Sequence, residues 1–223
     1  MVGCFFSKWT GEASVAGRQQ RAVRTREVIL EAAAEVFDES GFVGGSITRI
    51  TERAATTQGA IYFHFKSKEG LARAVIMHQA ARLQGLPQKP GGLQQLIDLT
   101  FYLAHELQRN VVFRAGVRLA VEQGESGLSE YSAYQEWIDR FRAELGAART
   151  AGELLPEAEE DVFAAVLVAG FTGSQVMSQI ASGRVDLPER IANLWRCLLP
   201  GVAEPVVRER LELDAARSRG RLC

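Results

Sequence analysis

The chain has 223 residues, a formal net charge of −1 and 47% hydrophobic residues, enough for a substantial core in one large or two small domains. Its three cysteines are scattered, with neither a CxxC motif nor paired histidines, which argues against a disulfide framework or a metal site. The longest apolar block (162–171) is about half the length that crosses a bilayer and no secretion signal opens the chain, so we expect a cytoplasmic protein with no membrane partner.

Charge is distributed unevenly along the chain. Residues 18–83 contain ten Lys/Arg and seven Asp/Glu, a balance of +3, so the remainder carries −4. A mildly cationic N-terminal part on an acidic remainder is typical of a phosphate-binding domain attached to a soluble sensor. Ordinary solvated surface charge explains the same distribution, so charge alone does not decide between the two.

Helical periodicity dominates, and no stretch alternates apolar and polar residues with period two, so we predict an all-α protein. Residues 1–17 are rich in glycine and serine without a periodic face, which predicts a flexible arm. A first helix is expected from about 19 to 40, and Gly41 supplies its stop. The apolar face of this helix consists of Ile29, Ala32, Ala33, Val36 and Phe37.

Residues 46–69 predict a short helix, a tight turn and a second short helix. Apolar residues recur at i, i+3 and i+7 in the first helix and at i, i+4 in the second. Helices this short need a third helix to dock on, and such a unit places one helix in a DNA major groove. We therefore predict a helix-turn-helix DNA-binding domain over residues 18–84, with Ser46 as one N-cap and the second short helix starting near Thr57.

A Pro/Gly-rich stretch at 85–92 predicts a hinge after a fourth helix, which starts at its cap Ser67 and runs to about residue 84. Residues 93–223 are expected to form a helical ligand-binding and dimerisation domain. Its helices are predicted at about 93–122 (broken near Asn110 or Gly116), 130–150, 157–182, 188–199 and 204–217.

Two segments carry a family resemblance: RTREVILEAA at 24–33, followed by Phe37, Gly41, Thr48 and Ile50, and QGAIYFHFKSKE at 58–69. Together they resemble the TetR family of bacterial repressors, and the quartet YFHF at 62–65 is similar to its γ-butyrolactone (autoregulator) receptor branch. The segments FRAGVRLA, EW and FTGSQ, which start at residues 113, 136 and 171, are weaker matches. The resemblance implies a homodimer on a pseudo-palindromic operator, released by a small apolar signalling molecule.

Two departures from that branch carry weight, because it commonly reads Gly-Val-Thr-Lys-Gly where this chain has ATTQG at 55–59. Gln58 removes a cation from the recognition helix but offers a bidentate contact to adenine, which would alter operator sequence or salt dependence. Ala55 replaces the turn glycine, which argues against a left-handed conformation there.

The second short helix supplies the central DNA contacts in this interpretation. Gln58 is predicted to meet base edges, and Tyr62 and His64 to meet phosphates or thymine methyl groups. Core packing is the alternative for these side chains, and it is the interpretation we favour for Phe63 and Phe65. The predicted DNA-binding residues are Thr48, Thr57, Gln58, Gly59, Ala60, Tyr62, His64 and Lys68.

Several of these assignments have an equally good structural explanation. Thr48 and Lys68 stand at helix starts, where they contact phosphate or serve as ordinary capping and surface groups. Four arginines lie near the start of the first predicted helix: Arg18, Arg21, Arg24 and Arg26. They either contact the DNA backbone or minor groove or form a solvated surface.

A ligand pocket is predicted in the C-terminal domain. By the resemblance, the Trp137 indole lines it, although an aromatic residue at helical spacing is more often part of a core. Thr172 and Gln175 are three positions apart in an apolar helix, so they share a face and need polar partners. These partners are a ligand or neighbouring helices.

Small residues in the same helix predict a two-fold dimer interface, because they allow helices to approach closely. The small residues are Ala164, Ala165, Ala169, Gly170, Gly173 and Ser174, and the next helix adds Ile191, Leu194, Trp195 and Leu198.

The sequence thus predicts a ligand-responsive repressor of operator DNA, with a γ-butyrolactone- or furan-like signal implied by the resemblance. A receptor homologue that responds to an antibiotic, another metabolite or no ligand is the alternative. An all-α enzyme is disfavoured because no nucleophile elbow, phosphate loop, paired-carboxylate or Cys/His motif is present, so we predict no catalytic residue, no metal and no cofactor. A constitutive DNA-organising protein would not need a C-terminal domain of about 130 residues.

Overall fold

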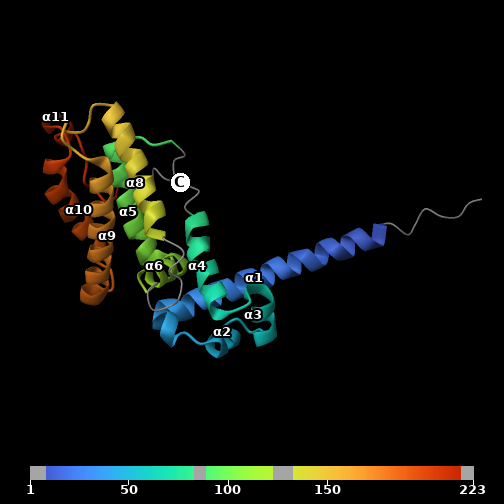
Figure 1. The fold of residues 1–223 in the computed structure, drawn as a ribbon. Coiled ribbons are helices and arrows are strands. Elements are labelled where there is room, and N and C mark those ends of the chain that lie inside the picture. Colours follow the sequence, from blue (N-terminus) through green and yellow to red (C-terminus); the bar gives the residue numbers. More distant parts are fainter. Residues whose placement is uncertain (1–8, 83–88, 123–132, 217–223) are drawn as a thin grey trace, which may run out of the picture.

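The computed structural model describes residues 9–82, 89–122 and 133–216, and helices account for most of these residues (Figure 1). An N-terminal domain contains α1 (Trp9–Gly44), α2 (Ile47–Arg53), α3 (Gln58–Phe65) and α4 (Lys68–Arg82). A C-terminal domain contains α5 (Leu93–Arg109), α6 (Val111–Val121), α8 (Ala133–Thr150), α9 (Glu160–Ser182), α10 (Leu187–Leu198), the 3₁₀ turn η2 (Leu199–Gly201) and α11 (Pro205–Arg208). The all-α prediction is confirmed.

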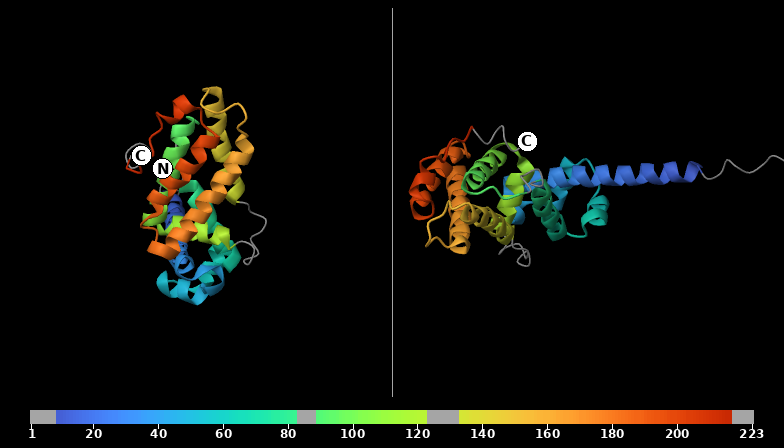
Figure 2. Two further views of the ribbon diagram at one scale, coloured as in Figure 1. Left: turned by 90° about the vertical axis from the view of Figure 1, so that its left-hand side faces the viewer. Right: turned by 90° about the horizontal axis from the view of Figure 1, so that it is seen from above.

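Helix α1 begins earlier than predicted. It is helical from Trp9, so the described part of the expected arm (9–17) is helix, and residues 1–8 lie outside the described ranges. Glycine within a helix costs only about 1 kcal/mol relative to alanine, so Gly11 and Gly17 weaken a helix without stopping it. Figure 2 shows the N-terminal half of α1 projecting well beyond the rest of the molecule.

The predicted stop at Gly41 is real. Gly41 has φ +67°, a left-handed conformation that interrupts the helical geometry before the chain turns toward α2. A Cβ atom at this position would lie 2.6 Å from Glu122 Oε1, so a larger residue would also displace this carboxylate. The residue therefore serves both the turn and the packing of the two domains.

Helix α6 belongs to both domains. The predicted break falls at Asn110, whose Oδ1 accepts a hydrogen bond from the Phe113 N–H (3.1 Å) and so caps α6. Val112, Ala115 and Leu119 are buried in the N-terminal core with residues of α1, α3 and α4, whereas Phe113 is buried in the C-terminal core. The short helix α6 thus joins the two cores.

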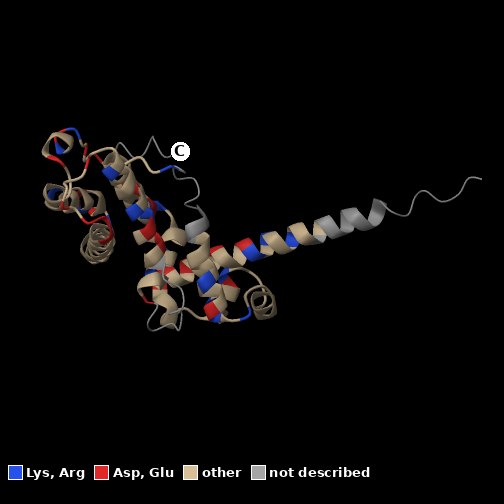
Figure 3. Ribbon diagram, turned by 45° about the horizontal axis from the view of Figure 1, so that its top comes forward, with Lys and Arg blue, Asp and Glu red and all other residues tan. Residues whose placement is uncertain are grey.

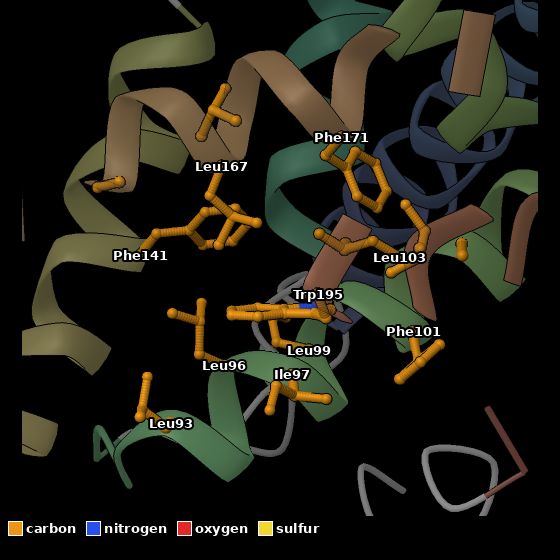
Figure 4. Close-up of a cluster of buried hydrophobic side chains, with 14 of the residues drawn as sticks. Leu93, Leu96, Ile97, Leu99, Phe101, Leu103, Phe141, Leu167, Phe171 and Trp195 are labelled. Carbon is orange, nitrogen blue, oxygen red and sulfur yellow. The ribbon is translucent and has the colours of Figure 1, made fainter. Parts of the chain in front are cut away.

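The C-terminal core is built around Trp195 and helix α5. Helices α5, α8, α9 and α10 pack side by side (Figure 1), and their apolar residues surround a fully buried Trp195 (Figure 4). The Trp195 Nε1–H donates to Thr100 Oγ1 (2.8 Å), so both polar groups are satisfied inside the core. The prediction that Trp195 and Ile191 lie at a dimer interface is wrong, because both have 0% exposure within one protomer.

The predicted hinge has one anchored end. Residues 85–88 lie outside the described ranges. At the other end, the Gly91 N–H donates to the fully buried Glu144 Oε2 (2.7 Å), and the Leu93 N–H donates to Glu153 Oε2 (2.8 Å). These carboxylates hold the start of α5 against α8 and the loop that follows it.

The last predicted helix is mostly absent. Helix α11 ends at Arg208, and the chain then runs without helix along α5. Gln94 exchanges two hydrogen bonds with the Glu212 backbone, and His105 Nε2 donates to the Ala215 carbonyl (3.0 Å). Side chains of α5 thus supply partners that a continued helix would have found in its own backbone.

Helix α9 leaves an apolar face uncovered. Ala164 is fully buried, and a Cβ at Gly170 would lie 2.9 Å from Leu194 Cδ1, so part of the small-residue stripe serves packing within the protomer. By length and composition α9 could also cross a membrane, but it packs against α8 and α10 as a bundle helix. Its large exposed residues are Val162, Val166, Val176, Met177 and Ile180.

Candidate DNA interface and ligand cavity

The turn between α2 and α3 has the predicted caps. The Ser46 and Thr57 hydroxyls accept hydrogen bonds from the N–H groups of Arg49 and Ala60, each at 3.2 Å. Ala55 adopts φ +46°, so the expectation drawn from the missing glycine is wrong. Because a left-handed alanine costs roughly 1 kcal/mol, docking of α3 on its neighbours must hold this turn in place.

Helix α3 has one buried and one exposed face. Ile61 (0% exposed) and Phe65 (6%) pack into the N-terminal core, as predicted. Gln58 and Tyr62 lie one turn apart on the opposite side and are exposed, and His64 is half-buried at the edge. None of these three side chains is enclosed within the protomer, which leaves them available to a partner.

Phe63 is not part of the core, so the prediction for this residue is wrong. Its side chain is 72% exposed, with Lys66 Nζ lying 5.8 Å from its ring centroid. Residue 63 follows the buried Ile61 by two positions, or about 200° around a helix, so periodicity already places it on the outer face. An aromatic side chain in water on this face is an energetically unfavourable arrangement unless a partner covers it.

Of the remaining predicted DNA-binding residues, some are exposed and one is held by contacts within the protomer. Thr48 and Gly59 are exposed, and the space around a Cβ at Gly59 is open except for Thr57 Oγ1 at 3.8 Å. Ala60 is half-buried. Lys68 is anchored, because Nζ donates to the Val43 carbonyl (3.4 Å) and lies 4.6 Å from the Phe42 ring centroid.

Two arginines of α2 are tied to α1. Arg49 and Arg53 both bond Glu39, at 2.8 and 2.6 Å, and the Arg53 hydrogen bond is the main cause of the lowered pKa of Glu39. These exposed pairs contribute little stability in water but fix the orientation of α2. Lys and Arg positions also recur along the coloured part of the projecting helix α1 in Figure 3, and Arg26 Cζ lies 5.1 Å from the Phe65 ring centroid.

A cavity in the C-terminal domain is lined by all three predicted ligand residues. It has a volume of about 50 Å³ and lies between α5, α6, α8 and α9. Trp137 contacts it as a half-buried side chain whose ring centroid is 6.0 Å from that of Phe141. The complete lining is Leu103, Phe113, Val117, Ala120, Tyr134, Trp137, Phe141, Val168, Phe171, Thr172 and Gln175.

Polar groups are few in this cavity. The Thr172 hydroxyl donates no hydrogen bond to any residue in the described ranges, whereas Gln175 Oε1 accepts one from Arg184 Nη2 (3.2 Å). Burial raises the pKa of the Tyr134 phenol, so that hydroxyl stays neutral. An apolar wall with a few hydroxyl, amide and indole groups suits an uncharged organic ligand.

Sequence reasoning missed the role of α6 in this site. Phe113, Val117 and Ala120 line the cavity, while other residues of the same helix are buried against α1 and α4. In the sequence, the segment at 113–120 gives only a weak family match, which does not indicate a pocket wall. No group of three or more His, Cys, Asp or Glu within the described ranges is placed to hold a metal ion.

Comparison with known proteins agrees with this architecture. The family model for bacterial regulatory proteins of the tetR family matches residues 29–75, and the model for a tetracyclin repressor-like C-terminal domain matches residues 91–204. The A-factor receptor protein of Streptomyces griseus is 39% identical over 190 residues, which cover 85% of this chain and 68% of that protein.

Solved structures include two similar regulators. TylP, a TetR regulator from Streptomyces fradiae, is 43% identical and superposes with a TM-score of 0.78 over 89% of this chain and 96% of that one. A γ-butyrolactone receptor described as ArpA-like is 30% identical, with a TM-score of 0.73 over 89% and 98% of the two chains. This chain therefore belongs to the TetR family of bacterial regulatory proteins, as a DNA-binding transcriptional repressor related to A-factor and γ-butyrolactone receptors.

Proposed function

We propose that this protein is a homodimeric cytoplasmic repressor that leaves a pseudo-palindromic operator when a small γ-butyrolactone- or furan-like molecule binds its C-terminal cavity. The observation that carries the proposal is the outer face of α3. Tyr62 and Phe63 are 46% and 72% exposed on a helix whose other face is fully packed. Aromatic side chains this exposed add little to the core of the isolated protomer, and they fit contact with DNA.

DNA reading would use the exposed face of α3. Gln58 would contact an adenine through its amide, and Tyr62 and Phe63 would contact thymine methyl groups or sugar edges. Gly59 offers open backbone surface for close approach to a phosphate. Thr48, Thr57, Ala60, His64 and Lys68 complete the proposed interface, with Thr57 and Lys68 acting mainly by fixing backbone geometry.

Dimerisation would use the uncovered apolar face of α9. A dimer interface of this kind removes an apolar surface from water and places two copies of α3 on one side of the DNA. Two recognition helices that read successive major grooves must lie about 34 Å apart. Leu194 and Leu198 on α10 are half-buried and stay in the proposed interface.

Release would act through α6. A ligand that fills the cavity presses on Phe113, Val117 and Ala120, and the other side of this helix is embedded between α1 and α4. A shift of α6 therefore moves the N-terminal domain, with α4 as the lever. A ligand preference of about 1–3 kcal/mol for the shifted state would weaken operator binding roughly 5- to 150-fold.

The decisive experiment isolates the operator first and the ligand second. DNA fragments bound by the protein are recovered from the genome of the organism that encodes it. The Tyr62→Ala and His64→Ala variants are then compared with the parent protein in mobility-shift assays on these fragments. Full-strength binding by both variants would refute the assigned contacts. Candidate lactones and furans are then added to the complex, and Trp137→Ala is expected to abolish release while leaving operator binding intact.

A second candidate is a homologue that answers to another metabolite, an antibiotic or no ligand. The cavity favours the last of these, a homologue without a ligand, because about 50 Å³ is small compared with the roughly 300–1,000 Å³ of typical ligand pockets. Calorimetric titration separates the two functions. Heat and operator release with lactones support the first, and an inert protein that still represses supports the second.

A further inference from the structure

A second cavity lies between the two domains and has a different chemistry. It has a volume of about 370 Å³ and is bounded by α1, α6, α9 and the turn after α9. Gln175 is the one residue that lines both this cavity and the apolar one. The charged groups in its wall are Asp38, Arg114, Arg118, Glu122 and Arg184.

Arg184 is the unusual member of this set. The residue is only 8% exposed, and its Nε has no hydrogen-bond partner in the described ranges. Its one side-chain hydrogen bond there runs from Nη2 to Gln175 Oε1 (3.2 Å), a neutral amide. Burying a guanidinium without a hydrogen-bonded anion is unfavourable, so an anion that binds this group would be stabilised there.

The other four charges already satisfy one another. Arg114 Nε donates to Asp38 Oδ2 (2.8 Å), and Arg118 Nε donates to Glu122 Oε1 (2.8 Å). The second oxygen of Glu122 accepts the Phe42 N–H (2.7 Å). Two pairs therefore cancel, and one positive charge remains on Arg184. Burial is the main cause of the lowered pKa of Arg184; the Asp38 carboxylate opposes it, and the guanidiniums of Arg114 and Arg118 lower the pKa further by smaller amounts.

The backbone holds Arg184 in place. Its φ is +72°, its N–H donates to the Ser178 carbonyl (3.1 Å), and its carbonyl accepts from Gln108 Nε2 (2.8 Å). The side chain is therefore anchored at its base and directed into the cavity by a fixed turn. A guanidinium positioned in this way presents a planar set of donors that matches a carboxylate.

We propose that this interdomain cavity is a separate binding site for a small carboxylate anion, with Arg184 as its principal ligand. A monoanion is favoured over a phosphate dianion, because one positive charge is uncompensated and two carboxylates already stand in the wall. The site goes beyond the proposed function, since uncharged signals would occupy the apolar cavity. A carboxylate on Arg184 competes with Gln175 Oε1 and frees an amide that also lines the apolar cavity, which couples the two sites.

Thermal unfolding of the full-length protein tests the site without DNA. Sodium butyrate is the probe, and neutral butyramide and sodium chloride at equal ionic strength are the references. At about ten times its dissociation constant, butyrate is expected to raise the Tm by about 3–5 °C over both references. Isothermal titration at the same ionic strength gives the dissociation constant directly.

Two variants assign the effect to Arg184. Arg184→Gln is expected to abolish the butyrate shift and, without butyrate, to keep or raise the Tm, because it removes an uncompensated buried charge. Arg184→Lys retains the charge without the planar donors and is expected to weaken butyrate binding about tenfold or more. The exposed Arg208→Gln is the matched control, and its butyrate shift should equal that of the parent.

Three results would overturn the assignment. The first is a butyrate shift no larger than that of sodium chloride. The second is a butyrate shift that persists in Arg184→Gln. The third is a large loss of stability in Arg184→Gln without butyrate, which would show that the buried guanidinium is already compensated within the protomer and serves folding.

Discussion

Gly41 of α1 and Glu122, the residue that follows the last turn of α6, lie in direct contact where the two domains meet. A Cβ at residue 41 would fall 2.6 Å from Glu122 Oε1, while Oε2 of the same carboxylate accepts the Phe42 N–H at 2.7 Å. The turn that leads into the recognition unit is therefore fixed by a side chain from the helix that lines the ligand cavity.

Gly41→Ala is expected to destabilise the protein by about 2 kcal/mol or more, because it adds a strained φ and displaces Glu122. Urea unfolding measures the change. Gly146→Ala is the matched control: Gly146 lies in α8, and a Cβ added there would meet open space, so alanine should stabilise by about 0.5–1 kcal/mol. Equal effects in both variants would contradict the proposed contact.

Phe63 and Phe65 allow DNA contact and core packing to be separated. Phe63→Ala should leave the Tm nearly unchanged and reduce operator affinity about tenfold, because its ring is 72% exposed. Phe65→Ala should reduce stability by about 3–5 kcal/mol. Thermal unfolding and mobility shifts on the same samples test both. Full operator affinity in Phe63→Ala would remove this residue from the interface.

Gln58 is expected to set one base preference. Gln58→Ala should cost about 1–3 kcal/mol at a single A·T pair and little elsewhere, which binding to a set of operator variants would reveal. Gln58→Lys should instead strengthen binding generally and steepen the plot of log K against log[salt] by about one unit. A uniform loss across all operator variants in Gln58→Ala would contradict base reading.

Met177 tests the dimer face. It is 62% exposed on α9, and Met177→Glu should give a monomer in sedimentation analysis with unchanged helicity, since a charge at an apolar interface is unfavourable. Operator affinity should fall with it. Arg208→Gln, at an exposed site on α11, should remain dimeric. A dimeric Met177→Glu protein would place the interface elsewhere.

The hydrogen-bonded carboxylate of Asp186 should make the protein less stable in acid. Hydrogen bonds from Ser178, Ser182 and Arg190 lower its pKa from 3.8 to about 2. The ionised form therefore stabilises the fold above about pH 4, and this contribution disappears as the pH falls toward 2. Asp186→Asn should have a lower Tm than the parent at pH 7, and the two curves should converge near pH 2. A constant difference across this range would contradict the role of ionisation.

The amino-acid sequence by itself determined the local features of this protein. Ser46 and Thr57 cap their helices, Gly41 ends the helical part of α1, and Asn110 divides α5 from α6, because each depends on bonds within a few residues. The positions of Gln58 and Tyr62 on the outer face of α3 follow from the same short-range periodicity. The same periodicity also predicts that Phe63 lies on the outer face, although its apolar side chain suggested a core residue.

Only the tertiary structure decided which apolar faces are covered. Trp195 is buried against Thr100, 95 residues away in sequence, so it belongs to the core and not to a dimer interface. The segment after Arg208 is held by Gln94 and His105 in place of its own helical bonds. Helix α6 has two apolar faces, and only docking assigns one to each domain. Periodicity reports that a face is apolar, whereas its partner depends on residues that are distant in the chain.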